Sequence, residues 1–224
     1  MAYVDLLRSI HHRTKRNYLE RVHGVNKAEC ARIAKRFDRD YWDGDRQHGY
    51  GGYRYDGRWR TLAQALIDRY ELMPGDRVLD IGCGKGHLLH DFTEVLPGIQ
   101  VAGIDVSRYA LEQAMPTVKP LLQHGSATEL PWSGRSFDLV VSINALHNLY
   151  NYELCRALRE IERVGRGGKY LVVDSYRTEE EKVNLLYWQL TCECFYTPAE
   201  WEWLFGQCGY SGDYGFSFYE NDHA

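Results

Sequence analysis

Short apolar runs alternate with segments of helical periodicity from about residue 61 to residue 208. Runs of about four to eight residues rich in Val, Ile and Leu are typical of strands buried on both faces of a parallel sheet. We expect such strands near residues 77–81, 100–104, 120–124, 137–143 and 169–174. The alternation of strands and helices predicts an α/β protein in which a mostly parallel sheet lies between two layers of helices, a three-layer α/β/α arrangement.

The helices between these strands are marked by their apolar faces and by their ends. We expect the first to begin at Thr61 and the others to lie near residues 86–95, 107–115, 151–163 and 198–208. The helix near 151–163 is expected to end at three glycines, Gly165, Gly167 and Gly168. Thr197 and Glu200 predict a capping box around Pro198 at the start of the last helix.

Two segments precede this alternation. Residues 1–36 predict one or two helices, the second of which starts after Asn26. Residues 37–60 interleave seven aromatic residues with five glycines and predict a glycine-hinged aromatic loop. Glycines make ordering costly in entropy, and these aromatic residues have no regular element to pack against. We therefore expect residues 38–57 to be mobile without a ligand and to close as a lid when one binds.

The 224 residues suffice for one domain with a sizeable core, and no linker divides them. Residues 1–60 are therefore expected to form an arm and lid on the same domain as residues 61–224. The composition, 44% hydrophobic and 26% charged, is that of an ordinary soluble globular protein. No apolar stretch approaches the length of a membrane span and the N-terminus is unlike a signal peptide, so a cytoplasmic location is expected.

Neither a metal site nor a disulfide framework is expected. The six cysteines include no Cys-x-x-Cys pair, and the histidines show no paired-ligand spacing. The net charge of −4 hides an asymmetry, because the first 36 residues hold nine of the 27 basic residues but only three of the 31 acidic ones. Such an arm could attract nucleic acid or a phosphorylated substrate. Docking onto the acidic body, or onto a second subunit of a homodimer, explains the charge equally, and without an RNA-binding signature nucleic acid is less favoured.

Residues 78–89 carry the strongest functional signal. Asp80 ends an apolar run, Gly82, Gly84 and Gly86 follow, and an apolar stretch then starts a helix. Glycines are needed where the backbone takes positive φ or comes too close to a ligand for a Cβ, and the N–H groups of a helix start favour an anionic or polar ligand. A nucleoside cofactor is therefore expected. The dinucleotide fingerprint needs a small residue where this chain has His87, which disfavours a dehydrogenase.

The segment from Asp80 to Gly86, Asp-Ile-Gly-Cys-Gly-Lys-Gly, resembles the first motif of class I S-adenosylmethionine-dependent methyltransferases. A second acid, Asp105, ends the apolar run 101–104, where it could accept hydrogen bonds from both ribose hydroxyls. The resemblance covers about residues 61–220 and implies a Rossmann-like sheet with S-adenosylmethionine as the cofactor. The strand ends at Asp80, Asp105 and Asn144 are then expected to converge on one site.

The resemblance also implies individual contacts to the cofactor. Gly82, Cys83, Gly84 and Gly86 would pass close to the methionine moiety, and Val106 would lie against the adenine. Where the family often has an aspartate for the adenine amino group, this chain has Ser126. That contact is weakened or falls to the serine oxygen, while the N–H of Ala127 is still available to the adenine ring.

The end of the chain departs from the family pattern. After Gly209 only about a dozen residues remain for the two strands, one of them antiparallel, with which the family usually ends. Either the last hairpin is abbreviated or one strand is missing. The sheet edge, and any dimer built on it, depends on which of the two holds.

Candidate chemistry lies at the strand ends and in the two covering segments. Methyl transfer from an activated sulfonium mainly needs alignment of the reacting atoms. His147 follows the fourth strand and is either a general base or a packing residue. Tyr50 and Tyr53 either contact a ligand or anchor their own loop. The aromatic loop and residues 184–196 are expected to form the substrate lid.

The sequence predicts an enzyme that uses S-adenosylmethionine to methylate an O or N atom of a small molecule. A carbohydrate or another metabolite precursor is the acceptor class that the resemblance suggests. Two alternatives stay open. One is an RNA or protein methyltransferase that uses the basic arm, and the other is a non-catalytic nucleoside-binding module.

Overall fold

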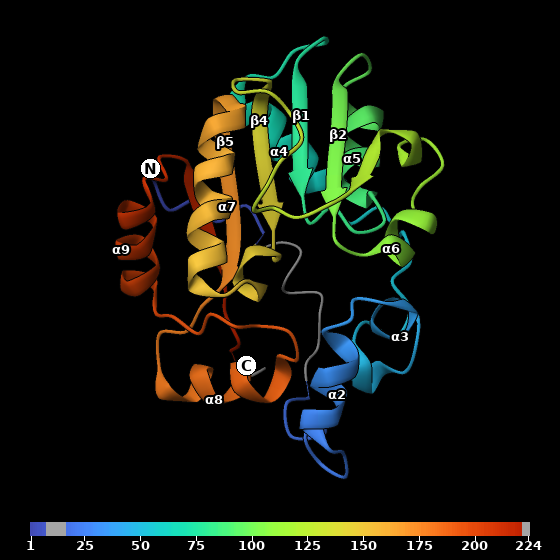
Figure 1. Cartoon of the computed structure of the whole chain (residues 1–224), viewed down its shortest axis with the longest axis vertical. Coiled ribbons are helices and arrows are strands. Elements are labelled where there is room, and N and C mark those ends of the chain that lie inside the picture. The colour runs from blue at the N-terminus through green and yellow to red at the C-terminus, as the bar shows by residue number, and fades with distance from the viewer. Residues whose placement is uncertain (8–16, 221–224) are drawn as a thin grey trace.

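The structure is a computed structural model that describes residues 1–7 and 17–220. Six strands in the described chain form one parallel sheet in the order β3-β2-β1-β4-β5-β6 (Figure 1). In chain order the strands are β1 (Arg77–Ile81), β2 (Gln100–Asp105), β3 (Leu122–His124), β4 (Phe137–Ile143), β5 (Gly165–Asp174) and β6 (Asp213–Ser217).

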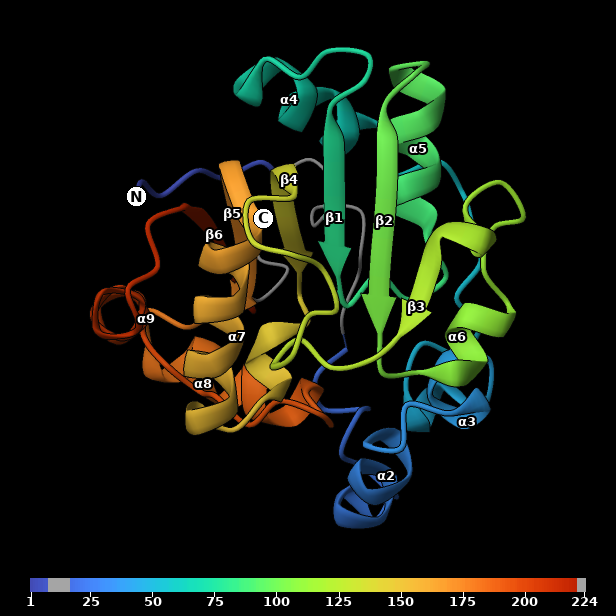
Figure 2. The same ribbon diagram turned by 45° about the horizontal axis from the view of Figure 1, so that its top comes forward.

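Helices surround this sheet. The α-helices are α2 (Lys27–Ala34), α3 (Arg39–Trp42), α4 (Arg60–Tyr70), α5 (His87–Val95), α6 (Arg108–Glu112), α7 (Asn151–Val164), α8 (Glu179–Trp188) and α9 (Pro198–Cys208). The 3-10 helices are η1 (Arg46–His48), η2 (Lys119–Leu121) and η3 (Leu146–Asn148). In Figure 2, α2, α3 and α8 lie beyond the arrowheads of the strands, so they cover the carboxyl ends of the sheet.

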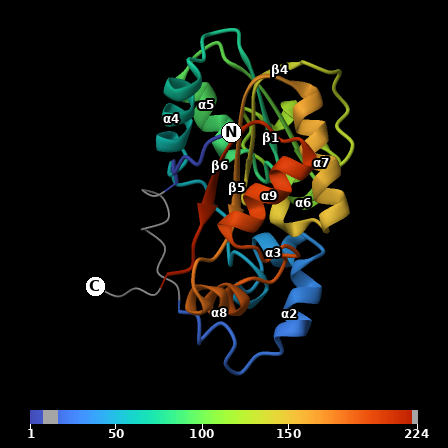
Figure 3. The same ribbon diagram turned by 90° about the vertical axis from the view of Figure 1, so that its left-hand side faces the viewer.

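The core consists of two layers, one on each face of the sheet. Figure 3 shows α4 and α5 on one face and α7 and α9 on the other. Along β1 the side chains alternate between these layers, since Val78 packs with α4 and α5 whereas Leu79 and Ile81 pack with α7 and α9. Both faces of the strand are therefore buried, which is why Val78, Leu79 and Ile81 are all apolar rather than alternating with polar residues. The three-layer α/β/α prediction is confirmed.

Helix α7 ends at Gly165, as predicted, but the three glycines belong to β5, which begins four residues earlier than expected. Gly165 has extended backbone angles and is the first residue of β5, where it pairs with Phe137. A Cβ on Gly167 would lie 2.4 Å from the Asp138 carbonyl oxygen, and one on Gly168 would lie 2.4 Å from the Tyr70 ring. These glycines are required because neighbouring groups press against the strand.

Helix α8 falls partly within the segment 184–196 that was predicted only as a lid. Its start carries an N-cap, because the Thr178 side chain accepts a hydrogen bond from the Glu181 N–H at 3.2 Å. Three glutamates in the first turn favour a helix there through the helix dipole. A threonine followed by acids was therefore a readable helix start. In α9, by contrast, the predicted capping box of Thr197 and Glu200 is confirmed.

The end of the sheet settles the question of the last hairpin. One strand, β6, follows α9, it runs parallel to β5, and no antiparallel strand occurs within the described residues. The N-terminal segment covers part of the outer edge of β6. The Val4 N–H donates to the Tyr214 carbonyl at 2.7 Å, and the Tyr214 N–H donates to the Ala2 carbonyl at 3.0 Å. A covered edge has fewer free backbone groups for pairing with a second subunit.

The arm docks onto the body of its own chain. The second predicted helix is α2, and the Asn26 side chain caps it. Residues 1–7 and 17–26 form no helix, and residues 8–16, where an earlier helix could fall, lie outside the described residues. Lys27 on α2 donates to the carbonyls of Tyr187 and Gln189 at 2.8 and 2.7 Å, and Lys35 pairs with Glu193. Docking onto the body therefore accounts for part of the basic charge in the arm.

Candidate functional site

The carboxyl ends of β1, β2 and β4 meet where the strand order reverses, which is the usual ligand site of open α/β sheets. A cavity of about 250 Å³, the first cavity, lies at these strand ends. Nine of the ten residues that the sequence singled out for cofactor binding line it: Asp80, Gly82, Cys83, Gly84, Asp105, Val106, Ser126, Ala127 and Asn144. The predicted convergence of the three strand ends is therefore confirmed.

The glycine loop after β1 has positive φ at Gly82 and Gly84, with values of +78° and +53°. A Cβ at Gly82 would lie 2.3 Å from the Cβ of Ala145, and one at Gly84 would lie 2.8 Å from the Trp42 ring. Side chains are excluded here by sterics as well as by backbone conformation. The backbone of the loop can therefore form the floor of the first cavity.

Gly86 was also predicted to bind the cofactor, but it lines neither the first cavity nor the second cavity that adjoins it. It is the left-handed N-cap of α5, and a Cβ on it would lie 2.8 Å from a methyl group of Val118. Its absent side chain permits packing of the helix start against the segment before β3. Its role in this structure is to position the loop.

The Asp105 carboxylate ties the glycine loop to the start of α6. Its Oδ2 accepts a hydrogen bond from the Gly84 N–H and its Oδ1 accepts one from the Ser107 N–H, both at 2.7 Å. Each carboxylate oxygen has two acceptor positions, so one position on each oxygen is left for a ligand. Burial raises the pKa of this carboxyl, and the side chain still reaches the first cavity.

Asp80 brings a second carboxyl to the same cavity with 4% of the residue exposed. Within the described part of the chain, no group donates a hydrogen bond to this carboxyl. Burial, and after it the charge of Asp105, raises the pKa of Asp80 to about 8. A cationic ligand group beside Asp80 would favour the ionised carboxylate and lower that pKa.

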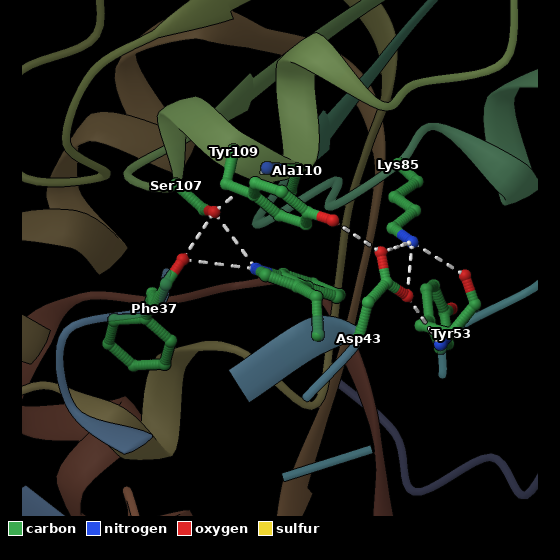
Figure 4. A network of polar contacts seen from close by, with 8 residues as sticks. Phe37, Asp43, Tyr53, Lys85, Ser107, Tyr109 and Ala110 are labelled. Carbon is green, nitrogen blue, oxygen red and sulfur yellow. Dashed lines mark hydrogen bonds and ion pairs between the residues drawn. The ribbon is translucent and has the colours of Figure 1, made fainter. Parts of the chain in front are cut away.

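An ion pair holds the aromatic loop, residues 37–60, against the glycine loop (Figure 4). The Nζ of Lys85 lies 2.7 Å from Oδ2 of Asp43 and 2.8 Å from its Oδ1, and it also donates to the Tyr53 carbonyl at 2.9 Å. The Tyr109 hydroxyl donates to Asp43 at 2.9 Å. Because the Lys85 side chain is 8% exposed, water screens this pair only weakly.

A second attachment of the aromatic loop lies beside the first. The indole N–H of Trp42 is 2.9 Å from the Ser107 hydroxyl and 3.1 Å from the Phe37 carbonyl (Figure 4). Ser107 also caps α6 by accepting the Ala110 N–H at 3.0 Å. The expectation that these aromatic residues lack a regular element to pack against is wrong, because α3 carries Trp42 onto the start of α6. Mobility of residues 38–57 without a ligand stays a prediction.

The two tyrosines predicted as catalytic have different surroundings. The Tyr53 ring stacks on His87 with centroids 4.7 Å apart, and its hydroxyl accepts the Trp59 indole N–H at 3.2 Å. Burial, and after it the charge of Lys85, lowers the pKa of His87 to about 4, so His87 is neutral at pH 7. Tyr50 stacks on Trp42, with centroids 5.3 Å apart, and is 42% exposed.

A second cavity of about 490 Å³ adjoins the first. The two share a wall made of Tyr41, Tyr50, Tyr53, Trp59 and Asn144. Most of its other lining residues come from the aromatic loop, from the end of β5 and from the end of α8 with the segment that follows it. Arg21 of the arm, His147 of η3 and Tyr219 after β6 complete the lining. The predicted lid segments thus meet over the second cavity, next to the site at the strand ends.

Asn144 stands at the junction of the two cavities in a left-handed conformation, with φ of +54°. Asparagine tolerates this conformation better than most residues do. Its Oδ1 accepts a hydrogen bond from the Ser217 hydroxyl at 2.9 Å. The strand end β4 and the last strand β6 therefore fix the orientation of this side chain.

His147 lines the second cavity rather than the first, and it is 2% exposed. Its Nδ1 accepts the backbone N–H of Asp174 at 3.1 Å, so the ring proton of the neutral form is on Nε2, which lies 3.4 Å from Oδ2 of Asp174. Burial lowers the pKa of His147, although the Asp174 charge opposes this. Both ring nitrogens are engaged within the protein, which favours the packing role over that of a base.

Asp174 lies at the centre of a group of polar side chains that includes His147. Besides His147, its Oδ2 accepts hydrogen bonds from the Tyr219 hydroxyl at 2.9 Å and from the Gln189 amide. Its Oδ1 accepts no hydrogen bond from the described residues, and the residue lines the second cavity. Neither Asp174 nor Lys85 was predicted as a site residue. The signals available in the sequence were an acid at the end of the fifth strand and a lysine inside the glycine motif.

Residues 1–7 and 17–220 contain neither a cluster of metal ligands nor a helix that could span a membrane. No three His, Cys, Asp or Glu side chains gather there as ligands for one metal ion. None of the helices in that part of the chain is both long and apolar enough to cross a membrane.

Comparison with known proteins gives a consistent result. A family described as a methyltransferase domain matches residues 72–209. The demethylmenaquinone methyltransferase of Symbiobacterium thermophilum is 31% identical over 145 residues, which are 59% of this chain and 57% of that protein. The 27-O-demethylrifamycin SV methyltransferase of Amycolatopsis mediterranei is 30% identical over 149 residues, which are 60% of this chain and 52% of that protein.

A solved structure is similar over most of the same region. The YcgJ protein from Bacillus subtilis superposes with a TM-score of 0.55 and 28% identity, over 65% of this chain and 66% of that one. The chain thus spans little more than half the length of the two curated relatives described above. The matched residues include both strand-end acids and the glycine loop, whereas the aromatic loop precedes the family match.

Proposed function

Because this chain belongs to the class I S-adenosylmethionine-dependent methyltransferases, we propose that it transfers a methyl group from S-adenosylmethionine to an O or N atom of a small molecule. The observation that carries the proposal is the pair of buried acids, Asp80 and Asp105, at neighbouring strand ends beside a loop that excludes side chains.

The first cavity fits this cofactor in three respects. The Asp80 carboxyl, which no described group contacts, suits the amino group of the methionine moiety. The remaining acceptor positions of Asp105 suit the ribose hydroxyls. Ser126 and Ala127 line the part of the cavity beyond Val106, where the adenine would bind. When bound, S-adenosylmethionine supplies a methyl group on a positively charged sulfur, which an acceptor displaces in line.

The residues of this chain would contribute alignment and exclusion of water. The aromatic loop, held by Lys85 and Ser107, separates the first cavity from solvent, which strengthens electrostatic interactions inside it. Asn144 and Tyr50 stand at the shared wall, where an acceptor in the second cavity would face the cofactor. Asp174, with its free Oδ1, is the group best placed to take a proton from the acceptor, and His147 orients it.

The small-molecule acceptor is supported by the second cavity, whose volume falls in the range of small-ligand sites, roughly 300–1,000 Å³. The names of two relatives also refer to non-polymeric acceptors, demethylmenaquinone and a 27-O-demethylrifamycin. Residues 1–60 supply the arm and the aromatic loop over both cavities, so we assign them to the same domain as residues 61–224.

The experiment that tests the proposal has a binding part and a transfer part. Calorimetry should detect S-adenosylmethionine or its demethylated product, and Asp105→Ala should weaken that binding by about 2–4 kcal/mol through lost charge-assisted hydrogen bonds. The matched control is Glu112→Ala on the exposed side of α6. Transfer is measured with methyl-labelled donor and pooled metabolites that carry hydroxyl or amino groups. Unchanged affinity in Asp105→Ala, or binding of NAD instead, would contradict the proposal.

A further inference from the structure

The second cavity is lined by more basic than acidic side chains, although the whole chain has a net charge of −4. Four arginines contribute to its lining, Arg21, Arg46, Arg54 and Arg58, against two acids, Asp56 and Asp174. The Arg58 guanidinium is neutralised by Asp56, with hydrogen bonds of 2.7 to 3.0 Å. Arg21, Arg46 and Arg54 are the other basic side chains by which arginines outnumber acids in the lining.

Two of these arginines are brought together on one aromatic ring. The guanidinium carbons of Arg21 and Arg46 lie 5.3 and 5.0 Å from the centre of the Trp188 ring. Arg21 donates to the carbonyls of Trp188 and Arg46, which are neutral acceptors, and it forms no ion pair with a described carboxylate. Burial, and after it the like charge of Arg46, lowers the pKa of Arg21. The pair is thus held close together against its mutual repulsion.

Further positive charge lies on both sides of this pair. Lys27 donates to the carbonyls of Tyr187 and Gln189, which flank Trp188 in the chain. Arg54, on the aromatic loop, is exposed at the cavity and contacts no described residue through a hydrogen bond or an ion pair. Guanidinium groups match carboxylate and phosphate groups in shape and charge. An acceptor that carried a cation, in contrast, would be repelled here.

We propose that the methyl acceptor is an anionic small molecule whose carboxylate or phosphate group is bound by Arg21, Arg46 and Arg54, while its nucleophilic atom faces the shared wall at Tyr50 and Asn144. This inference rests on the proposed function and narrows its substrate class. None of the three arginines lines the first cavity, so the anion site is separate from the cofactor site.

The test uses inorganic phosphate and succinate as probes in calorimetric titrations at constant ionic strength. Each is titrated into the full-length protein, with and without saturating S-adenosylhomocysteine. We expect at least one probe to bind, and the tighter one identifies the anionic group. Arg54→Gln and Arg21→Gln should each weaken its binding about tenfold, which corresponds to one charge-assisted hydrogen bond. Arg156→Gln, on the exposed side of α7, is the matched control and should leave the affinity unchanged.

Each other outcome is decisive. The inference is overturned if neither probe binds, if all variants bind equally, or if the arginine variants lose affinity for S-adenosylhomocysteine, because the arginines would then hold the cofactor. Arg54→Gln keeps the test valid if Arg21→Gln does not fold, since Arg54 is exposed and forms no hydrogen bond or ion pair with the described residues. If the wild type fails to bind S-adenosylhomocysteine, the proposed function fails, and the titration of cofactor-free protein still decides whether the anion site exists.

Discussion

The Lys85 ammonium, one residue beyond Gly84 in the glycine loop, lies 2.7 Å from the Asp43 carboxylate in the aromatic loop. The segment that covers the first cavity is thus fastened to the loop that forms its floor. We expect a ligand to enter or leave that cavity more readily when this contact is broken. The ion pair would then link ligand exchange to movement of the aromatic loop.

Breaking this ion pair should loosen the aromatic loop. Asp43→Asn leaves the Lys85 ammonium partly buried without its counter-ion, and we expect the closed loop to lose about 1–3 kcal/mol. Hydrogen exchange of residues 38–57 should become faster, and S-adenosylhomocysteine should dissociate more quickly. The matched control is Glu29→Gln, which breaks an exposed ion pair with Arg32 on α2. Equal exchange rates in Asp43→Asn and the wild type would show that other contacts hold the loop.

Asp80 should make the cofactor-free protein less stable as the pH rises. Its pKa is about 8 in the folded chain and about 3.9 in an unfolded one. Between these values the folded state holds a proton that the unfolded state has released, so the free energy of unfolding falls as the pH increases. Asp80→Asn should flatten this slope in urea unfolding at pH 5 and pH 7.5, while weakening binding of S-adenosylhomocysteine. A variant with the wild-type slope would mean that Asp80 is ionised when folded.

We predict that alanine substitutions at Tyr50 and Tyr53 affect turnover and stability differently. Tyr50 is 42% exposed and lies at the wall between the cavities. Tyr50→Ala should therefore lower turnover about tenfold or more through lost alignment, with little change in Tm. Tyr53 stacks on His87 and accepts the Trp59 N–H, so Tyr53→Ala should cost about 3 kcal/mol of stability. Loss of stability without loss of turnover in both variants would make the whole loop structural.

His147 is predicted to act through Asp174. His147→Gln removes a buried hydrogen-bonding ring and should lower stability by about 1–3 kcal/mol. Turnover should fall, but the shape of its pH profile should be unchanged, because both ring nitrogens of His147 are engaged within the protein and burial lowers its pKa. Asp174→Asn is the comparison, and it should alter the alkaline or acidic limb of the profile if the acceptor loses a proton. If one limb of the pH profile of turnover disappeared in His147→Gln, His147 would be the general base.

Local signals were enough to predict the sheet and the floor of the site. The strand β1 and the glycine loop follow from an apolar run, an acid and three glycines, whose conformations depend mainly on neighbouring residues. Expectations failed where distant parts of the chain decide the outcome. Gly168 lies in a strand because it pairs with Leu139 of β4, and it is a glycine because a Cβ there would meet the ring of Tyr70, almost 100 residues earlier in the chain. No local pattern contains that contact.

The same reason explains what was missed at the site. Lys85 was visible inside the motif, but its partner Asp43 lies in a segment whose path the sequence does not predict. His147 was placed correctly after the fourth strand, whereas its engaged ring nitrogens depend on Asp174 at the end of β5. The arginines of the second cavity come from the arm and from the aromatic loop, so only the folded chain brings them together.

The pairing of Tyr3 with Tyr214 has a consequence for the order of folding. Tyr3 is synthesised 211 residues before Tyr214, which lies on the strand edge that residues 2–4 cover. Closing such a long loop carries a large entropic cost, and it comes late because the partner strand must already be in place. Asp213 on that strand also contacts Ala2 and Arg69. Until β6 has been synthesised, residues 2–4 therefore have no strand edge to pair with, and removing them should speed unfolding more than it slows refolding.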